Sequence, residues 1–242
     1  MKLTIVGSSP AWPNPGGTQS GYLLEGSGRL LLDCGAGVLA RLRAAAASGW
    51  PEIDAIAITH FHLDHWADLV PWVWATLFGP GGGKPKPELW LHPRGADELA
   101  HFAGRLGRDG MFEQAFELRE YRDGEPFEAA GFAITPIRLL HYDIETYGFR
   151  VEDGSSTLAY SGDSGPSPAL ATLARGADLF LCEATLRRGE VEDDPRGHLS
   201  PEEASAAFAE SGATRLLVTH RPCELPLGPG IEQAHDGDEI SL

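Results

Sequence analysis

The 242-residue sequence has no apolar run that approaches the length of a membrane span, which takes about 20 consecutive apolar residues in a helix. Its first residues, Met1–Gly7, form a short apolar stretch before a turn and lack the longer apolar region of a signal peptide. Hydrophobic residues make up 42% of the chain and charged residues 22%, which is enough for a sizeable core. We therefore expect a cytoplasmic protein that has no membrane segment.

Basic residues are few compared with acidic ones. The 19 Lys and Arg residues face 35 Asp and Glu residues, which gives a net charge of −16 at pH 7. Such a surface repels polyanions, and no concentrated basic patch is visible that would bind an extended nucleic acid. We therefore expect no RNA or DNA partner, whereas a small anionic substrate can still bind where metal ions offset the charge.

Cysteine is scarce as well, and its three residues, Cys34, Cys182 and Cys223, lie far apart. Their number is odd and none forms a C-x-x-C pair, so the sequence offers no disulfide framework. We expect free thiols, mostly buried, in a reducing compartment. We single out Cys223 as a neighbour of a candidate site, because it closely follows His220.

The densest group of metal-binding side chains lies in the stretch His60-Phe61-His62-Leu63-Asp64-His65. The preceding segment Ile53–Ile58 alternates and is rich in Ile, which predicts a buried strand, and a helix can begin at Trp66. The polar residues therefore lie on a strand-to-helix turn, where their side chains can converge. Imidazole and carboxylate ligands suit zinc, manganese or iron better than they suit soft metals.

The H-x-H-x-D-H spacing of His60–His65 resembles the metal-binding signature of the metallo-β-lactamase superfamily. The resemblance implies two divalent metal ions, zinc or manganese with iron as the alternative, because matching ligands follow at later strand ends. It assigns the first metal to His60, His62, His141 and Asp163. It assigns the second metal to Asp64, His65, His220 and the shared Asp163.

The resemblance also implies a nucleophile, a hydroxide that bridges the two metals. Metal binding lowers the pKa of water toward about 7, and Asp64 would bind the second metal and orient the hydroxide. In the same family, the aspartate that matches Asp33 supports the metal loop without being a ligand. From the sequence alone, Asp33 could also cap the helix that follows it.

The order of the expected elements fits an α/β fold. Strands are expected at Lys2–Val6, Tyr22–Glu25, Arg29–Asp33, Ile53–Ile58, Glu88–His92, Phe116–Arg119, Phe132–Arg138, Tyr147–Val151, Leu158–Ser161, Asp178–Glu183, Leu216–His220 and Glu239–Leu242. Helices are expected from after Asp33 to about Ser48, over residues 95–118 and at Pro201–Glu210. Two such halves without a linker predict a four-layer αββα sandwich, the metallo-β-lactamase fold, formed by one domain over residues 1–242.

Two further elements narrow the branch of the family. Glu183-Ala184-Thr185 and Gly197-His198-Leu199-Ser200 resemble elements of the ribonuclease Z-like and phosphodiesterase branches. The resemblance implies that His198 protonates or stabilises the leaving group in phosphoryl transfer and that Glu183 orients His198. From the residues alone, Glu183 could also be a surface acid at a strand end and His198 a residue beside a helix.

The interval between His141 and Asp163 departs from ribonuclease Z. Many bacterial members insert a long transfer-RNA-binding arm there, whereas this gap has only about 20 residues. Together with the acidic charge, this favours a phosphodiesterase that acts on a small nucleotide or a cyclic phosphate diester. The alternatives are a ribonuclease Z-type endoribonuclease, a lactone or thioester hydrolase and, last, a non-catalytic metal-binding module.

Residues 66–78 are unusually aromatic, with Trp66, Trp72, Trp74 and Phe78. The segment predicts a buried helix or, alternatively, a wall of the substrate entrance or a homodimer face, because this helix often lies at a subunit interface in relatives. His92 is a lone histidine at a strand end, which we interpret as structural and not as a metal ligand.

Overall fold

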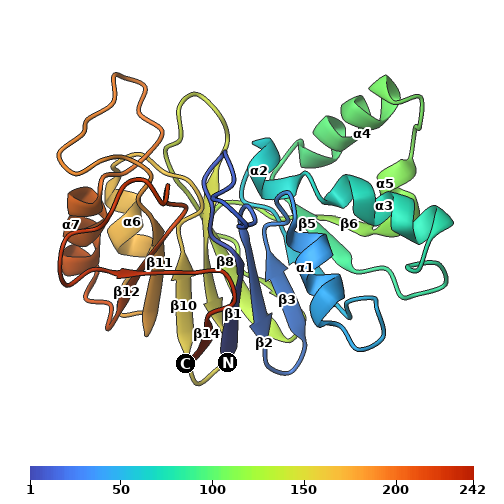
Figure 1. The fold of residues 1–242 in the computed structure, drawn as a ribbon, viewed down its shortest axis with the longest axis horizontal. Coiled ribbons are helices and arrows are strands. Elements are labelled where there is room, and N and C mark those ends of the chain that lie inside the picture. Colours follow the sequence, from blue (N-terminus) through green and yellow to red (C-terminus); the bar gives the residue numbers. More distant parts are fainter.

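Two seven-stranded sheets lie face to face in the computed structural model, which describes residues 1–242 (Figure 1). The first sheet has the strand order β14-β1-β2-β3-β4-β5-β6. Its strands are β1 (Lys2–Gly7), β2 (Gly21–Glu25), β3 (Arg29–Leu32), β4 (Ala55–Ala57), β5 (Glu88–Leu91), β6 (Glu117–Glu120) and β14 (Glu239–Ser241). From β3 to β6 the neighbouring strands are parallel.

The second sheet has the order β13-β12-β11-β10-β9-β8-β7. Its strands are β7 (Phe127–Ala129), β8 (Phe132–Arg138), β9 (Tyr147–Glu152), β10 (Thr157–Tyr160), β11 (Leu179–Glu183), β12 (Leu216–Thr219) and β13 (Glu232–Gln233). Strands β10 to β13 are parallel. Apolar side chains of both sheets meet in one buried layer, which includes Leu24, Leu32, Phe149 and Leu181.

Helices cover the outer face of each sheet (Figure 1). Those that pack on the first sheet are α1 (Val38–Ala45), α3 (Leu69–Phe78), α4 (Gly95–Arg105) and α5 (Met111–Ala115). Those that pack on the second sheet are α6 (Pro168–Leu173) and α7 (Pro201–Ser211). This arrangement confirms the predicted four-layer αββα sandwich. None of the helices combines the length and the apolar character that crossing a bilayer requires.

Helix α7 shows how local sequence sets the bounds of an element. The Ser200 hydroxyl accepts a hydrogen bond from the Glu203 backbone N–H, and the Glu203 carboxylate accepts one from the Ser200 N–H. This capping box pairs donors that a helix start leaves unsatisfied. Gly212 ends the helix at φ 68°, in the left-handed region that favours glycine.

The helix predicted over residues 95–118 is wrong in its middle and at its end. Helix α4 ends at Arg105, α5 begins at Met111, and β6 already begins at Glu117. The break contains Gly107 and Gly110, whose φ angles of 65° and 69° do not belong to a right-handed helix. The helix predicted through about Ser48 likewise ends earlier, at Ala45.

The helix that follows the His60–His65 turn is also divided. A single helical turn, α2 (Leu63–Trp66), carries two of the polar residues, and α3 begins only at Leu69. Between them, the Asp68 carboxylate accepts a hydrogen bond from the Leu39 backbone N–H at the start of α1 (2.7 Å). The turn is thereby fastened to the first sheet's helical layer.

Candidate metal and catalytic site

The site lies where parallel strands of both sheets end. Asp33 follows β3, and the His60–His65 turn follows β4 in the first sheet. In the second sheet, Asp163 follows β10, Glu183 ends β11 and His220 follows β12. The carboxyl ends of parallel strands form a common edge, so these side chains converge although they are far apart in sequence.

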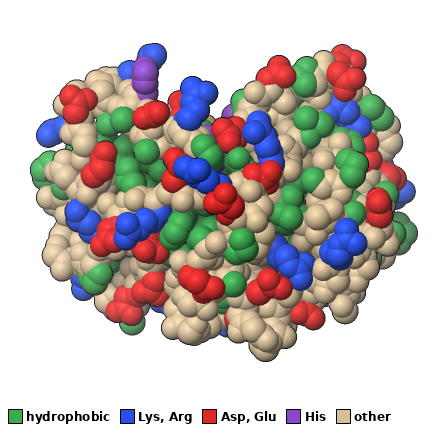
Figure 2. All heavy atoms as spheres, turned by 180° about the vertical axis from the view of Figure 1, so that it is seen from behind, with side chains coloured by type: hydrophobic (Ala, Val, Ile, Leu, Met, Phe, Trp, Pro, Cys, Tyr) green, Lys and Arg blue, Asp and Glu red, His purple; other side chains and the backbone are tan.

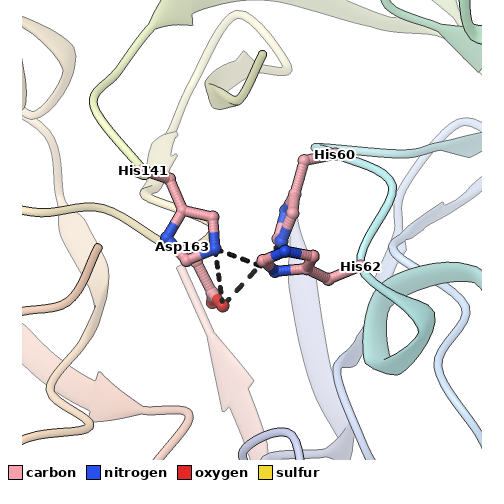
Figure 3. Close-up of side chains that lie close together, drawn as sticks. All are labelled: His60, His62, His141 and Asp163. Carbon is pink, nitrogen blue, oxygen red and sulfur yellow. Dashed lines mark hydrogen bonds and ion pairs between the residues drawn. The ribbon is translucent and has the colours of Figure 1, made fainter. Parts of the chain in front are cut away.

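One cluster consists of His60, His62, His141 and Asp163 (Figure 3). One ligand atom from each residue lies within 4.8 Å of the others. His141 Nε2 is 2.9 Å from His62 Nδ1 and 3.8 Å from Asp163 Oδ2, and His60 Nε2 is 3.9 Å from the same oxygen. We call this group the first cluster.

A second cluster consists of Asp64, His65, His220 and the same Asp163. His220 Nε2 lies 3.0 Å from Asp64 Oδ2 and 3.5 Å from Asp163 Oδ1. His65 Nε2 lies 3.4 Å and 3.3 Å from these two oxygens. Because the two Asp163 oxygens face different clusters, this carboxylate joins them.

Hydrogen bonds behind the clusters orient four of the histidine rings. Each bond occupies Nδ1 and leaves Nε2 directed toward a cluster, an arrangement that fixes metal ligands. The bonded pairs are His60 with Thr59 Oγ1 (3.0 Å), His65 with Asp33 Oδ2 (2.8 Å), His141 with Gly197 O (2.6 Å) and His220 with Thr185 Oγ1 (2.9 Å).

Asp33 lies outside both clusters and holds the turn in place. Besides His65, its buried carboxylate accepts hydrogen bonds from the Thr59 N–H (2.8 Å) and the Tyr160 hydroxyl (2.7 Å). Tyr160 ends β10, so this carboxylate also ties the two sheets together. It does not cap α1, whose N-cap is Gly37.

The clusters contain buried polar atoms that no protein group satisfies. His60 Nε2, His65 Nε2 and Asp163 Oδ1 are buried and have no hydrogen-bond partner. Leaving such atoms unpaired costs free energy, and native proteins rarely do so. Imidazole nitrogens and carboxylate oxygens are ligands for zinc, manganese or iron. The donor set therefore fits divalent metal ions.

The pKa values of the histidines differ between the clusters. Burial lowers the pKa of His60 well below its usual value and that of His141 to about 4, so both rings stay neutral. Burial also acts on His65, but the carboxylates of Asp163, Asp33 and Asp64 outweigh it and raise its pKa well above its usual value. The second cluster thus has an excess of negative charge that attracts a cation.

A third group, Glu183 and His198, lies beside the second cluster and shares His220 with it. His198 Nδ1 donates to Glu183 Oε1 (2.9 Å), and the Glu183 side chain is 0% exposed. Burial opposes the charged form of His198, yet Glu183 raises the pKa of the ring to about 9. The His198 ring lies 5.0 Å from the His141 ring, between centroids.

Glu192 and Tyr142, which the sequence analysis does not select, hold His198 from behind. Glu192 Oε2 accepts hydrogen bonds from the backbone N–H groups of Gly197 and His198 (both 2.9 Å), and Glu192 Oε1 accepts one from the Tyr142 hydroxyl (2.9 Å). A Cβ atom on Gly197 would lie 2.2 Å from the Tyr142 ring. The glycine before His198 was the one available signal of this close packing.

All nine side chains that the sequence suggested for the site come together: His60, His62, Asp64, His65, His141, Asp163, Glu183, His198 and His220. Cys223 is exposed and belongs to none of the clusters, and His92 and His101 do not belong to them either. In the aromatic segment, Trp66 and Trp72 are buried in the core, whereas Phe78 is 71% exposed.

Two curated relatives align with nearly the whole chain. The chain is 30% identical to the probable metallo-hydrolase YhfI of Bacillus subtilis, over 92% of this chain and 87% of that protein. It is also 30% identical to ribonuclease Z of Mycobacterium marinum, over 91% of this chain and 86% of that protein.

Solved structures share the fold. The crystal structure of YhfI, a metallo-β-lactamase fold protein, superposes with a TM-score of 0.83 and 26% identity over 99% of this chain and 98% of YhfI. A diphosphatase of the PhnP family superposes with a TM-score of 0.77 over 100% of this chain and 97% of that chain, and its 21% identity indicates the fold alone.

Residues 28–221 match the family described as the beta-lactamase superfamily domain. This segment contains every residue of the two clusters together with Glu183 and His198. The match confirms the family that the His60–His65 spacing predicts. The chain belongs to the metallo-β-lactamase superfamily and is one of its metallo-hydrolases.

Proposed function

We propose that the protein is a phosphodiesterase that uses two divalent metal ions to hydrolyse a small nucleotide or cyclic phosphate diester. The observation that carries this proposal is the Glu183–His198 pair beside two clusters that share Asp163. A fixed proton donor of this kind assists the departure of a poor alkoxide leaving group, such as that of an alkyl phosphate diester. The same side chains come from both sheets, which supports one catalytic domain.

The first and second clusters would each hold one metal ion, zinc, manganese or iron. When bound, these ions supply Lewis acidity toward a phosphoryl oxygen and lower the pKa of a coordinated water. Asp64 is the one carboxylate that belongs to the second cluster alone. Its position allows it to orient the attacking water and accept its proton.

His198 acts at the other end of the reaction. Its Nδ1–H is held by Glu183, so Nε2 is the atom available to the substrate. Glu183 favours the charged imidazolium, because a carboxylate stabilises a cation next to it. The ring can then give its Nε2 proton to the departing oxygen, and its backbone is held by Glu192.

A ribonuclease Z-type activity is the second candidate, because the Mycobacterium marinum relative bears that name. The segment between His141 and Asp163 argues against a transfer-RNA-binding arm in this chain. It is taken up by β9 and β10, which pair with each other and form part of the second sheet. The net charge of −16 points the same way.

The test uses the His198→Ala variant and two substrates that differ in their leaving group. For 3′,5′-cyclic AMP, whose alkoxide must be protonated, we expect turnover to fall about 10²-fold or more. For bis-p-nitrophenyl phosphate, whose leaving group needs no proton, the loss should be smaller. Metal content should not change. Equal losses on both diesters would remove His198 from leaving-group protonation, and cleavage of precursor transfer RNA alone would overturn the substrate class.

A further inference from the structure

A cavity of about 350 Å³ opens directly beside the first cluster. It lies between the start of α4 and the loop that precedes β9, two segments that stand apart at the upper edge of Figure 1. From behind, the surface is notched at this edge (Figure 2). His62 lines the cavity and also belongs to the first cluster, so a substrate bound at this cluster can extend into the cavity. Its volume suits part of a small ligand.

His92 offers an unpaired polar atom in this cavity. The residue is 6% exposed, and its Nδ1–H donates to the Pro93 carbonyl (2.6 Å). Its Nε2 has no hydrogen-bond partner in the chain, and in the neutral ring this atom is an acceptor. The ring packs edge-on against Phe61, with centroids 5.1 Å apart, so its orientation is fixed.

Three of the four charged residues that line the cavity are exposed and have no partner in the protein. Arg94, Glu98 and Asp143 line it, and none of them forms a salt bridge or a side-chain hydrogen bond. The fourth, Glu145, accepts a hydrogen bond from the Tyr147 hydroxyl (2.7 Å). Three carboxylates against one guanidinium make the cavity acidic, which disfavours a second phosphate. The carboxylates are suited instead to a ligand with N–H donors. The Arg94 guanidinium is suited to a carbonyl or a ring nitrogen of the ligand.

The remaining walls are apolar. Phe61 and Ile144 line the cavity, and a flat ring can lie against such side chains. Arg94 has φ 71°, a costly conformation for a residue with a side chain, which is kept where the surroundings enforce it. The cavity thus combines apolar walls with carboxylates, one imidazole acceptor and one guanidinium donor.

From this combination we propose that the cavity is a base-recognition subsite for a nucleobase that carries an exocyclic amine, as adenine and guanine do. The inference rests on the proposed phosphodiesterase function and names its substrate class. The phosphate would sit at the two clusters, the base in the cavity, and the leaving oxygen toward His198. Asp143 accepts hydrogen bonds from the amine, and Arg94 donates to an acceptor atom of the ring.

The first arm of the test compares substrates that differ only in the base. With manganese-loaded protein, kcat/KM for 3′,5′-cyclic AMP and cyclic GMP should exceed that for cyclic IMP by about tenfold, because one hydrogen bond to a charged group is lost or reversed. Asp143→Asn should remove the preference for cyclic AMP over cyclic IMP, since an amide can also donate to the inosine carbonyl. Asp109→Asn, an exposed acid outside the cavity, should retain it.

The second arm separates the subsite from the catalytic proposal. Calorimetry on the metal-loaded protein should show AMP binding about tenfold more tightly than IMP, with the difference lost in Asp143→Asn. The subsite alone would be overturned if the protein hydrolysed bis-p-nitrophenyl phosphate but showed no base preference among the cyclic nucleotides. Equal binding of AMP and IMP would overturn it as well. If no diester were hydrolysed while the binding difference persisted, the phosphodiesterase function would fall and the base site would stand.

Discussion

The two clusters share Asp163 but differ in charge and in access. The second cluster has two carboxylates, and each of its four residues is buried. The first cluster has one carboxylate, and its His62 is only half-buried and borders the cavity. Behind the second cluster stands a further carboxylate, Asp33, whereas a backbone carbonyl and a hydroxyl support the first.

This difference predicts unequal metal affinities. A divalent cation in the second cluster is offset by more negative charge and is less exposed to water, so it should be held more tightly. The first cluster, beside the cavity, is better suited to contact the substrate. The protein should therefore take up metal in two resolvable steps.

The largest effect should follow from replacing the shared ligand. Asp163→Asn removes a negative charge from both clusters, so we expect both metals to be lost. We expect kcat/KM on bis-p-nitrophenyl phosphate to fall about 10³-fold or more, since Lewis-acid stabilisation is worth several kcal/mol. Metal analysis and kinetics measure this, with Asp109→Asn as the control. Retention of one tightly bound ion would show that Asp163 does not join the clusters.

The next effect should be confined to the first cluster. His62→Ala removes a ligand that is half-buried, so water can fill its place without destabilising the core. We expect the weaker metal-binding step to disappear and the tighter one to persist, with turnover reduced about 10²-fold. A titration with zinc that is followed calorimetrically resolves the steps. Loss of the tighter step would reverse the assignment of the stronger site.

Asp33→Asn should affect the second cluster instead of the first. It weakens the support of His65 and reduces the charge near that ring. Loss of a group that hydrogen-bonds to a metal ligand typically lowers metal affinity about 10–100-fold. The affinity of the tighter binding step should therefore fall toward that of the weaker step. Because the Asn amide can still pair with Thr59 or Tyr160, the protein should fold. Equal weakening of both steps would show that Asp33 acts through the general structure.

Much of the candidate site could be predicted because its residues follow local rules. His60–His65 are consecutive on one turn, so their spacing alone brings them together. Asp163 and His220 each end a buried strand, and strand ends of parallel sheets meet at one edge. The αββα layers followed from the alternation of strands and helices in the same way.

What could not be predicted depends on contacts between distant segments. The sequence interpretation of His92 as structural agrees with its burial, but its unpaired Nε2 matters only because Asp143, 51 positions later, lines the same cavity. The sequence pattern stays helical across the break between α4 and α5, apart from its glycines, so the pattern predicts one continuous helix there. Glu192 belongs to a segment without periodicity, so nothing in the sequence relates it to Tyr142.

The smallest effect concerns this Glu192 contact, which touches neither cluster. Glu192→Ala removes the acceptor for the Gly197 and His198 N–H groups and for the Tyr142 hydroxyl. We expect kcat on 3′,5′-cyclic AMP to fall about three- to tenfold, because a less ordered His198 is less often in position to donate its proton. Metal uptake should keep both steps, since no ligand is changed.

The conservative variant separates positioning from charge. In Glu192→Gln, the amide oxygen can accept both backbone hydrogen bonds, and its NH₂ group can donate to the Tyr142 oxygen. This variant should therefore recover most of the kcat that Glu192→Ala loses, and bis-p-nitrophenyl phosphate should be nearly insensitive to either change. If Glu192→Gln were as slow as Glu192→Ala, the carboxylate charge near His198, and not the geometry of its backbone, would be what the reaction needs.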